Sequence, residues 1–508
     1  MKRLLRCCSS FSVAISSVTI YSFAIYSFAI VMLIGCLGSS SPLSAQAWKQ
    51  IPIPKLPEFN PPKPKRIQLA NGMVIFLQED HELPLIDGTA RIRGGEHSVP
   101  ANKAGMMDIY GEAWRTGGTK TQTGDQLDDF LEQRAAKVET GALGDSTTIS
   151  FSCLKEDFGD VFRMFDDLLR NPEFRADKIE IAKKGEYDSI SRRNDEPSQI
   201  AGREAAKLVY GAGSPYARVP EYATVAAVTR EDLVQWHSTY VHPSNIILGV
   251  VGDFDSAKME ARVREAFDSW PAGTANKETA IAPHPAAPGY YLVEKTDVNQ
   301  SDIQMVAVGT TKKNPDYFAI SVFNEAFGGG FSSRLFGDIR TTKGLAYAVG
   351  GGIGTGFDHD GMIRMMVMTK SGTTFESIAA IDEEIAGLAK NPISEDEIKR
   401  AKDAILNSFV FRLDSPGKVL QEQMAYEFYG YPASFLEDFE KGIERVTKED
   451  VARVAAKYLH RDQMAVLVVG NSGEFDKEPG TLGPAHKIDI RIPAPPPGIV
   501  TEQGGPGQ

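Results

Sequence analysis

The sequence contains the same segment twice. VTREDLVQWHSTYVHPSNIILGVVG, residues 228–252, aligns without gaps with VTKEDVARVAAKYLHRDQMAVLVVG, residues 446–470, and nine of the 25 positions are identical at an offset of 218. In each copy, Val-Thr followed by Glu-Asp predicts the capped start of a helix, which ends near Tyr-x-His and leads into a buried apolar strand. A period near 220 residues indicates a duplicated domain rather than the short unit of a solenoid.

The other patterns predict a mixture of strands and helices. RIQLANGMVIFLQED has Asn-Gly between two strand-like runs, which indicates a β-hairpin, and residues 66–96 are predicted to hold two strands. Further strands are predicted within 137–154, and IDIRI at 488–492 is a candidate for a last strand. Helices are predicted over residues 103–115, 124–135, 156–170, 176–194 and 315–327. Because the two kinds of element do not alternate strictly, the sequence predicts an α+β fold with mainly antiparallel sheets.

Composition divides the chain into six segments. The Pro-rich run IPIPKLPEFNPPKPK precedes the first predicted strand, and the Pro/Ala/Gly stretch PAGTANKETAIAPHPAAPG separates the two copies of the repeat. We therefore expect, in order, a leader at 1–47, an extended segment at 48–65, a first domain at 66–270, a linker at 271–289, a second domain at 290–475 and a Pro/Gly-rich tail at 476–508.

The N-terminus has the pattern of an export signal. Three basic residues precede a long apolar and hydroxyl-rich run, and Ala-Gln-Ala at 45–47 is a small-x-small cleavage pattern. One alternative is Leu-Ile-Gly-Cys at 33–36, which resembles a lipobox and would lipidate Cys36. Another is an uncleaved anchor, because the run is long enough to span a bilayer. All three export the chain, either to the periplasm or to the outer side of a bacterial membrane.

Net charge and cysteine use narrow the function classes. The formal net charge is −12, and it becomes −15 without the three basic residues of the leader. Since no Lys/Arg-rich patch stands out, we expect no nucleic-acid partner. Cys153 is the only cysteine after the leader, so that part of the chain has no intrachain disulfide, and the alternating pattern around it predicts a buried thiol.

A glycine-rich stretch lies in the second predicted domain. FGGGFSSRLFGDIRTTKGLAYAVGGG, residues 327–352, matches neither G-x-x-x-x-G-K-[ST] nor G-x-G-x-x-G, so we do not expect it to bind a phosphate. Its glycines predict a tight turn that brings backbones close together. Taken alone, Arg340 could bridge to Asp338 and Tyr347 could pack into the core.

Several motifs together resemble the pitrilysin/insulinase-type (inverzincin) peptidase family. They are LANGMVIFLQED, the RGGE-H-KAGMM segment, GGTKT, GGGFSSRLFGDIRTTKGLAYAV and the duplicated repeat, and the resemblance covers residues 66–475. It implies two tandem homologous α/β-roll domains, each an antiparallel sheet backed by helices, which together form a half-clamshell. Two such half-shells close around a peptide substrate, and active members carry zinc on H-x-x-E-H with the glutamate as general base.

The zinc motif is missing from this sequence. In KAGMMDIYGEAWRTGGT the two histidine positions hold Asp108 and Glu112, the glutamate position holds Gly111, and no register of the alignment supplies a histidine. None of the eight histidines lies four residues from another. A further ligand position of the family falls in KKGEYDSIS, where Glu186 and Asp188 are candidates. Carboxylates favour magnesium or calcium over zinc, so we expect no metal on this chain.

The resemblance assigns Arg340 and Tyr347, residue for residue, to a pair that reaches the substrate near the scissile bond. Arginine presents a fork of donors to a carbonyl or carboxylate, and a tyrosine hydroxyl can donate to a developing oxyanion. We therefore expect the non-catalytic, substrate-binding subunit of an exported heterodimeric zinc metallopeptidase. Zinc is then expected on a homologous partner that carries H-x-x-E-H. Two alternatives remain: a catalytically inert peptide-binding or scaffold protein of the cell envelope, and an atypical active metallopeptidase.

Overall fold

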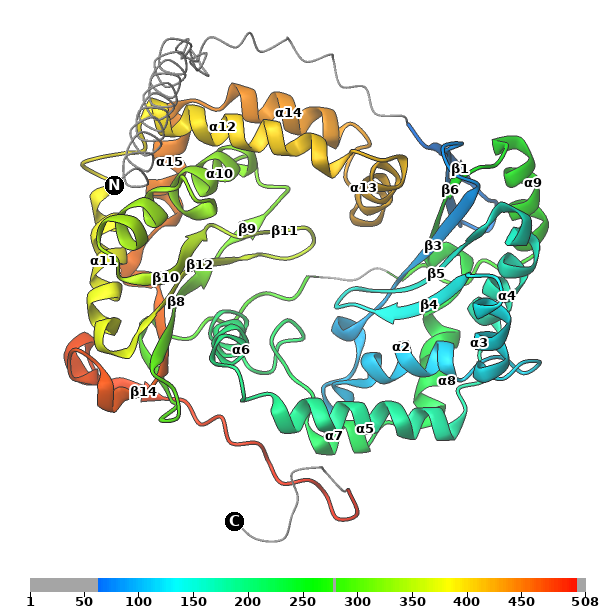
Figure 1. Cartoon of the computed structure of the whole chain (residues 1–508), viewed down its shortest axis with the longest axis horizontal. Helices are drawn as coiled ribbons and strands as arrows, with labels where there is room; N and C mark the ends of the chain where they lie inside the picture. The colour runs from blue at the N-terminus through cyan, green and yellow to red at the C-terminus, as the bar shows by residue number, and fades with distance from the viewer. Residues whose placement is uncertain (1–62, 277–279, 500–508) are drawn as a thin grey trace, which may run out of the picture. The chain divides into compact units, whose positions relative to one another are not determined.

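The computed structural model describes residues 63–276 and 280–499 (Figure 1). The predicted leader at 1–47, with Cys36, and most of the predicted extended segment lie outside these residues. Residues 63–276 are called the first half below, and residues 280–499 the second half. Within the described residues, no helix is long and apolar enough to cross a membrane.

Each half contains a six-stranded, mainly antiparallel sheet, as the sequence predicts. The first sheet has the order β1-β2-β6-β3-β5-β4 and the second has the order β10-β12-β8-β13-β7-β14. The strands of the first sheet are β1 (Lys65–Gln68), β2 (Val74–Glu79), β3 (Leu85–Arg93), β4 (Lys137–Ala142), β5 (Ser146–Leu154) and β6 (Ile246–Gly252). Those of the second are β7 (Gly289–Glu294), β8 (Gln300–Val308), β10 (Ala346–Gly352), β12 (Met362–Lys370), β13 (Ala465–Gly470) and β14 (Ala485–Lys487), and β9 (Thr310–Thr311) pairs with β11 (Thr355–Gly356).

Each half also contains the helices that pack against the sheets. In the first half they are α2 (Met106–Thr116), α3 (Gly124–Glu132), α4 (Phe158–Arg170), α5 (Ala176–Arg192), α6 (Pro197–Tyr210), α7 (Tyr222–Ala226), α8 (Arg230–Tyr240) and α9 (Ser256–Phe267). In the second half they are α10 (Tyr317–Asn324), α11 (Thr374–Gly387), α12 (Glu395–Phe409), α13 (Pro416–Tyr429), α14 (Phe435–Arg445) and α15 (Lys448–Tyr458). Two π-helical segments, η6 (Glu325–Gly329) and η7 (Phe336–Thr342), also belong to the second half.

The two copies of the repeat fold alike. Thr229 and Thr447 start α8 and α15, and each threonine forms a reciprocal capping box with the aspartate three residues later. Both helices end at the tyrosine of Tyr-x-His. The predicted buried strands follow as β6 and β13. The expected pair of sheet-and-helix domains is thereby confirmed.

Two strand predictions need correction. The predicted hairpin is present, with Gln68 opposite Val74, but residues 66–96 hold three strands rather than two because β3 follows it. IDIRI is not a strand: pairing with β7 occurs at 485–487 instead and ends where the Ile488 amide donates to the Leu292 carbonyl. The alternating isoleucines of IDIRI are partly buried and pack against apolar clusters, so their pattern reflects this packing rather than strand pairing.

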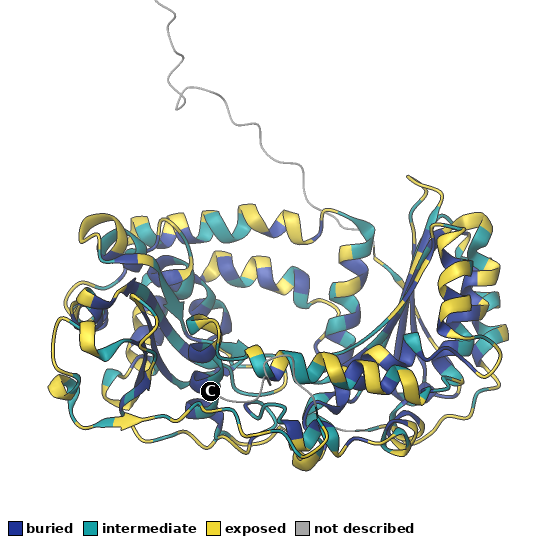
Figure 2. Cartoon of the chain, turned by 60° about the horizontal axis from the view of Figure 1, so that its bottom comes forward, coloured by how far each residue is buried: buried dark blue, intermediate teal, exposed yellow. Residues whose placement is uncertain are grey.

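The strands β6 and β13 are apolar throughout because both faces of each sheet are covered. One face packs against helices of the same half, and Figure 2 shows the buried residues concentrated on the strands and on the helix faces turned toward them. The other face of the first sheet packs on α13, through Val74, Phe76 and Ile247 against apolar side chains of that helix. The other face of the second sheet packs on α6. Each half thus contributes one helix, α6 or α13, that covers a face of the sheet in the other half.

Polar contacts hold α13 on the first sheet. Arg66 forms a two-pronged ion pair with Glu427, with nitrogen–oxygen distances of 2.9 and 2.7 Å. At the end of the helix, the Arg91 guanidinium donates to the Tyr429 hydroxyl at 2.8 Å, and that hydroxyl donates to the Asp145 carboxylate. These bonds fix the position of the exchanged helix.

Candidate functional site

The degenerate zinc motif lies on α2, where the resemblance places it. The helix starts after Gly105, the last residue of the preceding loop, which adopts a left-handed conformation with a φ of +89°. Asp108 and Glu112 lie one turn apart and are both exposed. Asp108 nevertheless has neighbouring protein atoms around its carboxylate, and this partial burial raises its pKa.

Gly111 faces a different direction from these two acids. It is buried, and a Cβ there would lie 3.2 Å from the Ala142 amide nitrogen of the edge strand β4. The Gly111 carbonyl accepts a hydrogen bond of 2.6 Å from the Thr140 hydroxyl. A carboxylate at this position would run into β4, so in this register the helix has no room for a general base.

Of the two candidates in KKGEYDSIS, Glu186 and Asp188, only Glu186 interacts with the acids of α2. The pKa of Glu186 is raised to about 7, mainly by burial and in addition by the charges of Asp108, Glu112 and Glu96. Asp188 acts elsewhere, on the hydroxyl of Tyr222. The structure therefore brings Glu186 of α5 to Asp108 and Glu112 of α2.

Glu96 is the member of this acidic group that sequence reasoning missed. Burial raises its pKa to about 7, against the opposing effect of Arg218, whose Nε lies 3.7 Å from the carboxylate. The Gly105 amide also donates to it, at 3.4 Å, next to the start of α2. The glutamate stands in the RGGE-H segment, but nothing in that motif indicates that the chain folds it back against α2.

This group does not fit a zinc ion. All four members are carboxylates, whereas the family's zinc motif supplies histidines. In residues 63–276 and 280–499, no three or more His, Cys, Asp or Glu side chains are grouped so that they could hold a metal ion.

In the second half, Arg340 and Tyr347 lie on neighbouring elements. Arg340 belongs to the π-helical segment η7, and Tyr347 belongs to β10. The guanidinium carbon lies 5.9 Å from the centre of the Tyr347 ring and 4.7 Å from that of Phe336. π-helical turns are frequent at functional sites, because they offset the side chains that follow.

A β-bulge turns Tyr347 outward. On the partner strand β12, Thr369 pairs with Ala346 and the adjacent Met368 pairs with Ala348, so Tyr347 is an extra residue with no partner. The Thr369 hydroxyl donates to the carbonyl of Leu345 at 2.6 Å and fixes the start of the strand. Tyr347 is consequently 73% exposed, which excludes the reading that it packs into the core.

Among the described residues, neither the Arg340 guanidinium nor the Tyr347 hydroxyl has a hydrogen bond or ion pair. Asp338, which could have bridged to Arg340, instead binds Lys343 at 2.7 Å. That lysine also pairs with Glu383, at 3.1 Å. The pair therefore presents to solvent donors that no described residue binds.

The glycines of the stretch are structural, as predicted. A Cβ on Gly328 would lie 2.5 Å from the Gly351 carbonyl oxygen and 2.7 Å from its amide nitrogen. This close approach joins η6 to β10. The run is not only a turn, however, since Gly328 and Gly329 belong to the π-helical segment η6.

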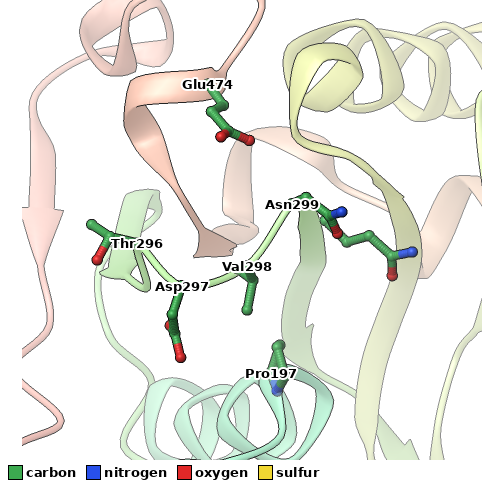
Figure 3. A pocket seen from close by; sticks show the side chains of 7 residues that line it. Pro197, Thr296, Asp297, Val298, Asn299 and Glu474 are labelled. Atoms are coloured by element: carbon green, nitrogen blue, oxygen red, sulfur yellow. The ribbon is translucent and has the colours of Figure 1, made fainter.

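A pocket of about 530 Å³ lies elsewhere in the structure (Figure 3). It is lined by residues 296–299 of the loop between β7 and β8, by Gln300 at the start of β8, by Pro197 at the start of α6, and by Glu474. Asp297 in this loop is paired with Lys295 at 3.0 Å. The pocket includes none of the predicted site residues.

Comparisons with known proteins give consistent results. The model "Insulinase (Peptidase family M16)" matches residues 110–210, and "Peptidase M16 inactive domain" matches residues 227–405. A zinc protease of Mycobacterium leprae (strain TN), described as uncharacterised, is 25% identical over 360 residues, which cover 69% of this chain and 79% of that protein. A non-peptidase homolog, YmxG, of Helicobacter pylori (strain ATCC 700392 / 26695) is 21% identical over 411 residues, which cover 80% and 94%.

The fold is also found among solved structures. The crystal structure of the peptidase M16 inactive domain from Pseudomonas fluorescens matches with a TM-score of 0.71 and 23% identity. The match covers 80% of this chain and 98% of that one. At this level of identity the likeness concerns the fold alone.

Proposed function

Because this chain belongs to the insulinase (M16) peptidase family, we propose that it is the non-catalytic, substrate-binding subunit of an exported heterodimeric zinc metallopeptidase. The observation that carries the proposal is the Arg340–Tyr347 pair, whose donors are exposed and without partners among the described residues. Because the sequence contains no H-x-x-E-H, the proposal requires the zinc on a homologous partner subunit. The carboxylates on α2 and α5 support this assignment, because zinc motifs of this kind use histidine ligands.

The chemistry divides between the two subunits. The partner's zinc would supply an activated water for attack on the peptide carbonyl. On this chain, the Arg340 fork holds a backbone carbonyl or a carboxylate of the peptide. The Tyr347 hydroxyl donates to the oxyanion that develops during the attack, and loss of one such donor costs about 3 kcal/mol of barrier.

Reconstitution tests this proposal. The chain is purified together with a homologous subunit that carries H-x-x-E-H, and cleavage of a peptide library is compared with that by each subunit alone. We expect the mixture to cleave faster, and Tyr347→Phe to lower kcat by about 100-fold. Arg340→Ala should raise KM as well. Arg163→Ala, which removes an exposed arginine of α4, is the matched control.

Two results would defeat the proposal. One is a partner that cleaves peptides equally well without this chain, and the other is full activity of both site variants in the mixture. Peptide binding without cleavage by any partner would favour the inert binding or scaffold protein of the cell envelope. About one zinc per isolated chain, lost in Glu112→Ala, would favour an atypical active metallopeptidase.

Export forms part of the same proposal. The leader pattern, with cleavage after Ala47 or lipidation of Cys36 as alternatives, supports a location in the periplasm or on the outer side of a bacterial membrane. Labelled palmitate in a bacterial host tests lipidation: incorporation that is lost in Cys36→Ala assigns the anchor. Absence of label, together with a mature N-terminus after Ala47, assigns simple secretion.

A further inference from the structure

Phe331 stands exposed in the same glycine-rich stretch as the Arg340–Tyr347 pair. It is 83% exposed, more than any other large apolar residue in the described part of the chain. Its ring meets the Phe336 ring edge-on, with centroids 5.1 Å apart and planes at 85°. The Phe336 ring in turn contacts the Arg340 guanidinium. Phe331, Phe336, Arg340 and Tyr347 therefore form one continuous series of side chains, called the aromatic strip below.

The backbone beneath the aromatic strip is firmly held. Gly328 packs against β10 on one side of Phe331, and Leu335 is completely buried on the other. Between them, Arg334 binds both carboxylate oxygens of Glu397, at 3.0 and 2.8 Å. The exposure of Phe331 is therefore a feature of an anchored segment. A phenyl ring held in water beside unpaired donors has the composition of a binding surface, with an apolar body and polar groups that fix orientation.

We propose that Phe331, with Phe336, binds a large apolar side chain of the peptide whose carbonyl or carboxylate is held by Arg340. The inference rests on the proposed function and names the substrate class: extended peptides with an aromatic or large aliphatic residue near the bound carbonyl. The separations along the aromatic strip, 5.1 and 4.7 Å, place the Phe331 ring at most roughly 10 Å from the Arg340 guanidinium. In an extended peptide that distance is about three residues.

The size of the surface favours a peptide over the partner subunit as the occupant. A stable protein interface needs about 800 Å² from each side, whereas one aromatic side chain supplies about 200 Å². The alternation of an apolar ring with a fork of donors also matches a peptide, in which side chains alternate with carbonyl groups. Phe331 acts here as a specificity residue and not as a catalytic one.

Direct binding to the full chain tests the inference without any need for cleavage. Two fluorescein-labelled Gly/Ser peptides with free carboxyl termini are used, one with phenylalanine two residues before the terminus and one with serine there. Fluorescence anisotropy then measures Kd for the wild type, Phe331→Ala, Phe331→Leu and Arg340→Ala. Phe411→Ala is the matched control, because Phe411 is also exposed, at 68%, and lies in the turn after α12.

We expect Phe331→Ala to weaken binding of the phenylalanine peptide by about tenfold and to leave the serine peptide unchanged. Phe331→Leu should restore most of the affinity, and Phe411→Ala should change neither peptide. If Arg340→Ala weakens both peptides while Phe331→Ala weakens neither, the inference fails and the proposed function stands. If no peptide binds measurably, both fail. If Phe331→Ala weakens association with the H-x-x-E-H partner in sedimentation velocity and leaves peptide binding intact, the surface belongs to the subunit interface and the inference is overturned.

Discussion

Gly328 and Gly351 meet backbone to backbone, with room for no side chain at Gly328: a Cβ there would lie 2.5 Å from the Gly351 carbonyl oxygen. This contact ties η6 to β10, the edge strand that carries the bulged Tyr347. The position of Tyr347 thus depends on a glycine nineteen residues before it in the sequence.

Gly328→Ala should therefore destabilise the chain and displace Tyr347. A backbone atom cannot move aside as a flexible side chain can, so we expect a loss of about 2–3 kcal/mol in the free energy of unfolding. Gly337→Ala is the matched control, because a Cβ there meets nothing within 4 Å. It should be neutral or stabilising by up to about 1 kcal/mol. Urea denaturation followed by circular dichroism measures both, and equal stability of the two variants would contradict the close packing.

Arg334 and Arg340 lie six residues apart but should have different roles. Arg334 should contribute to stability, and Arg340 to peptide binding. Arg334 is bound to Glu397, to the Asn391 carbonyl and to the Pro392 carbonyl, whereas Arg340 has no polar partner among the described residues. Arg334→Ala should cost about 2–3 kcal/mol of unfolding free energy. Arg340→Ala should stay within about 0.5 kcal/mol of the wild type. Thermal and urea unfolding of the two variants provide the measurement, and a large stability loss in Arg340→Ala would argue for a structural role.

The acidic group around α2 and α5 should make stability depend on pH between about 4.5 and 7. The pKa of Glu186 is raised from its ordinary value of 4.5 to about 7. Between these values the folded chain binds the proton more tightly than the unfolded chain, so this contribution to stability falls as pH rises from about 4.5 to 7. Glu186→Gln removes the charge and keeps the shape. We expect it to be about 1–2 kcal/mol more stable than the wild type at pH 8, with no gain near pH 4.

Asp188→Asn, on the same helix, is the control for that comparison, since Asp188 does not act on Glu186. Urea unfolding at several pH values between 4 and 8 measures the difference between the variants. A Glu186→Gln variant with no gain at pH 8 would show that the carboxylates do not crowd one another.

Buried His237 should give the opposite pH dependence. Burial lowers its pKa from the ordinary value of 6.5 to about 3. Its Nδ1 accepts from the Tyr110 hydroxyl at 2.7 Å, and its Nε2–H donates to the Leu169 carbonyl. The unfolded chain binds the extra proton first, so stability should fall as pH drops from about 6.5 toward 3, by about 1 kcal/mol per unit. His237→Phe should lose this part of the acid sensitivity in urea titrations, and an unchanged slope would contradict a neutral buried imidazole.

The elements predicted best are those whose signals are local. Thr229 and Asp232 encode a helix start within four residues, and the structure shows their capping box. The turn at Asn71-Gly72 is equally local, since Gly72 adopts the φ of +92° that glycine permits. In such cases the residues that carry the signal are also the residues that make the contacts.

The parts that sequence did not predict depend on distant contacts. The bulge that exposes Tyr347 is defined by the pairing of Thr369 and Met368, which no pattern in AYAVGGG announces. Glu96 reaches the acidic group only because the loop after β3 folds back on α2. IDIRI has a strand-like period because its isoleucines are partly buried, although the segment itself is not a strand. Partial burial of a segment and its pairing in a β-sheet can both produce an alternation of apolar and polar residues in the sequence.

The helices α6 and α13 occupy equivalent places in the duplicated units, and each packs on the sheet of the opposite half. This reciprocal exchange of helices resembles a domain-swapped dimer whose two subunits have been joined into one chain. Neither half can then fold independently, because each half alone would leave one apolar face of its sheet exposed to solvent. A cut in the linker should therefore release no independently folded fragments.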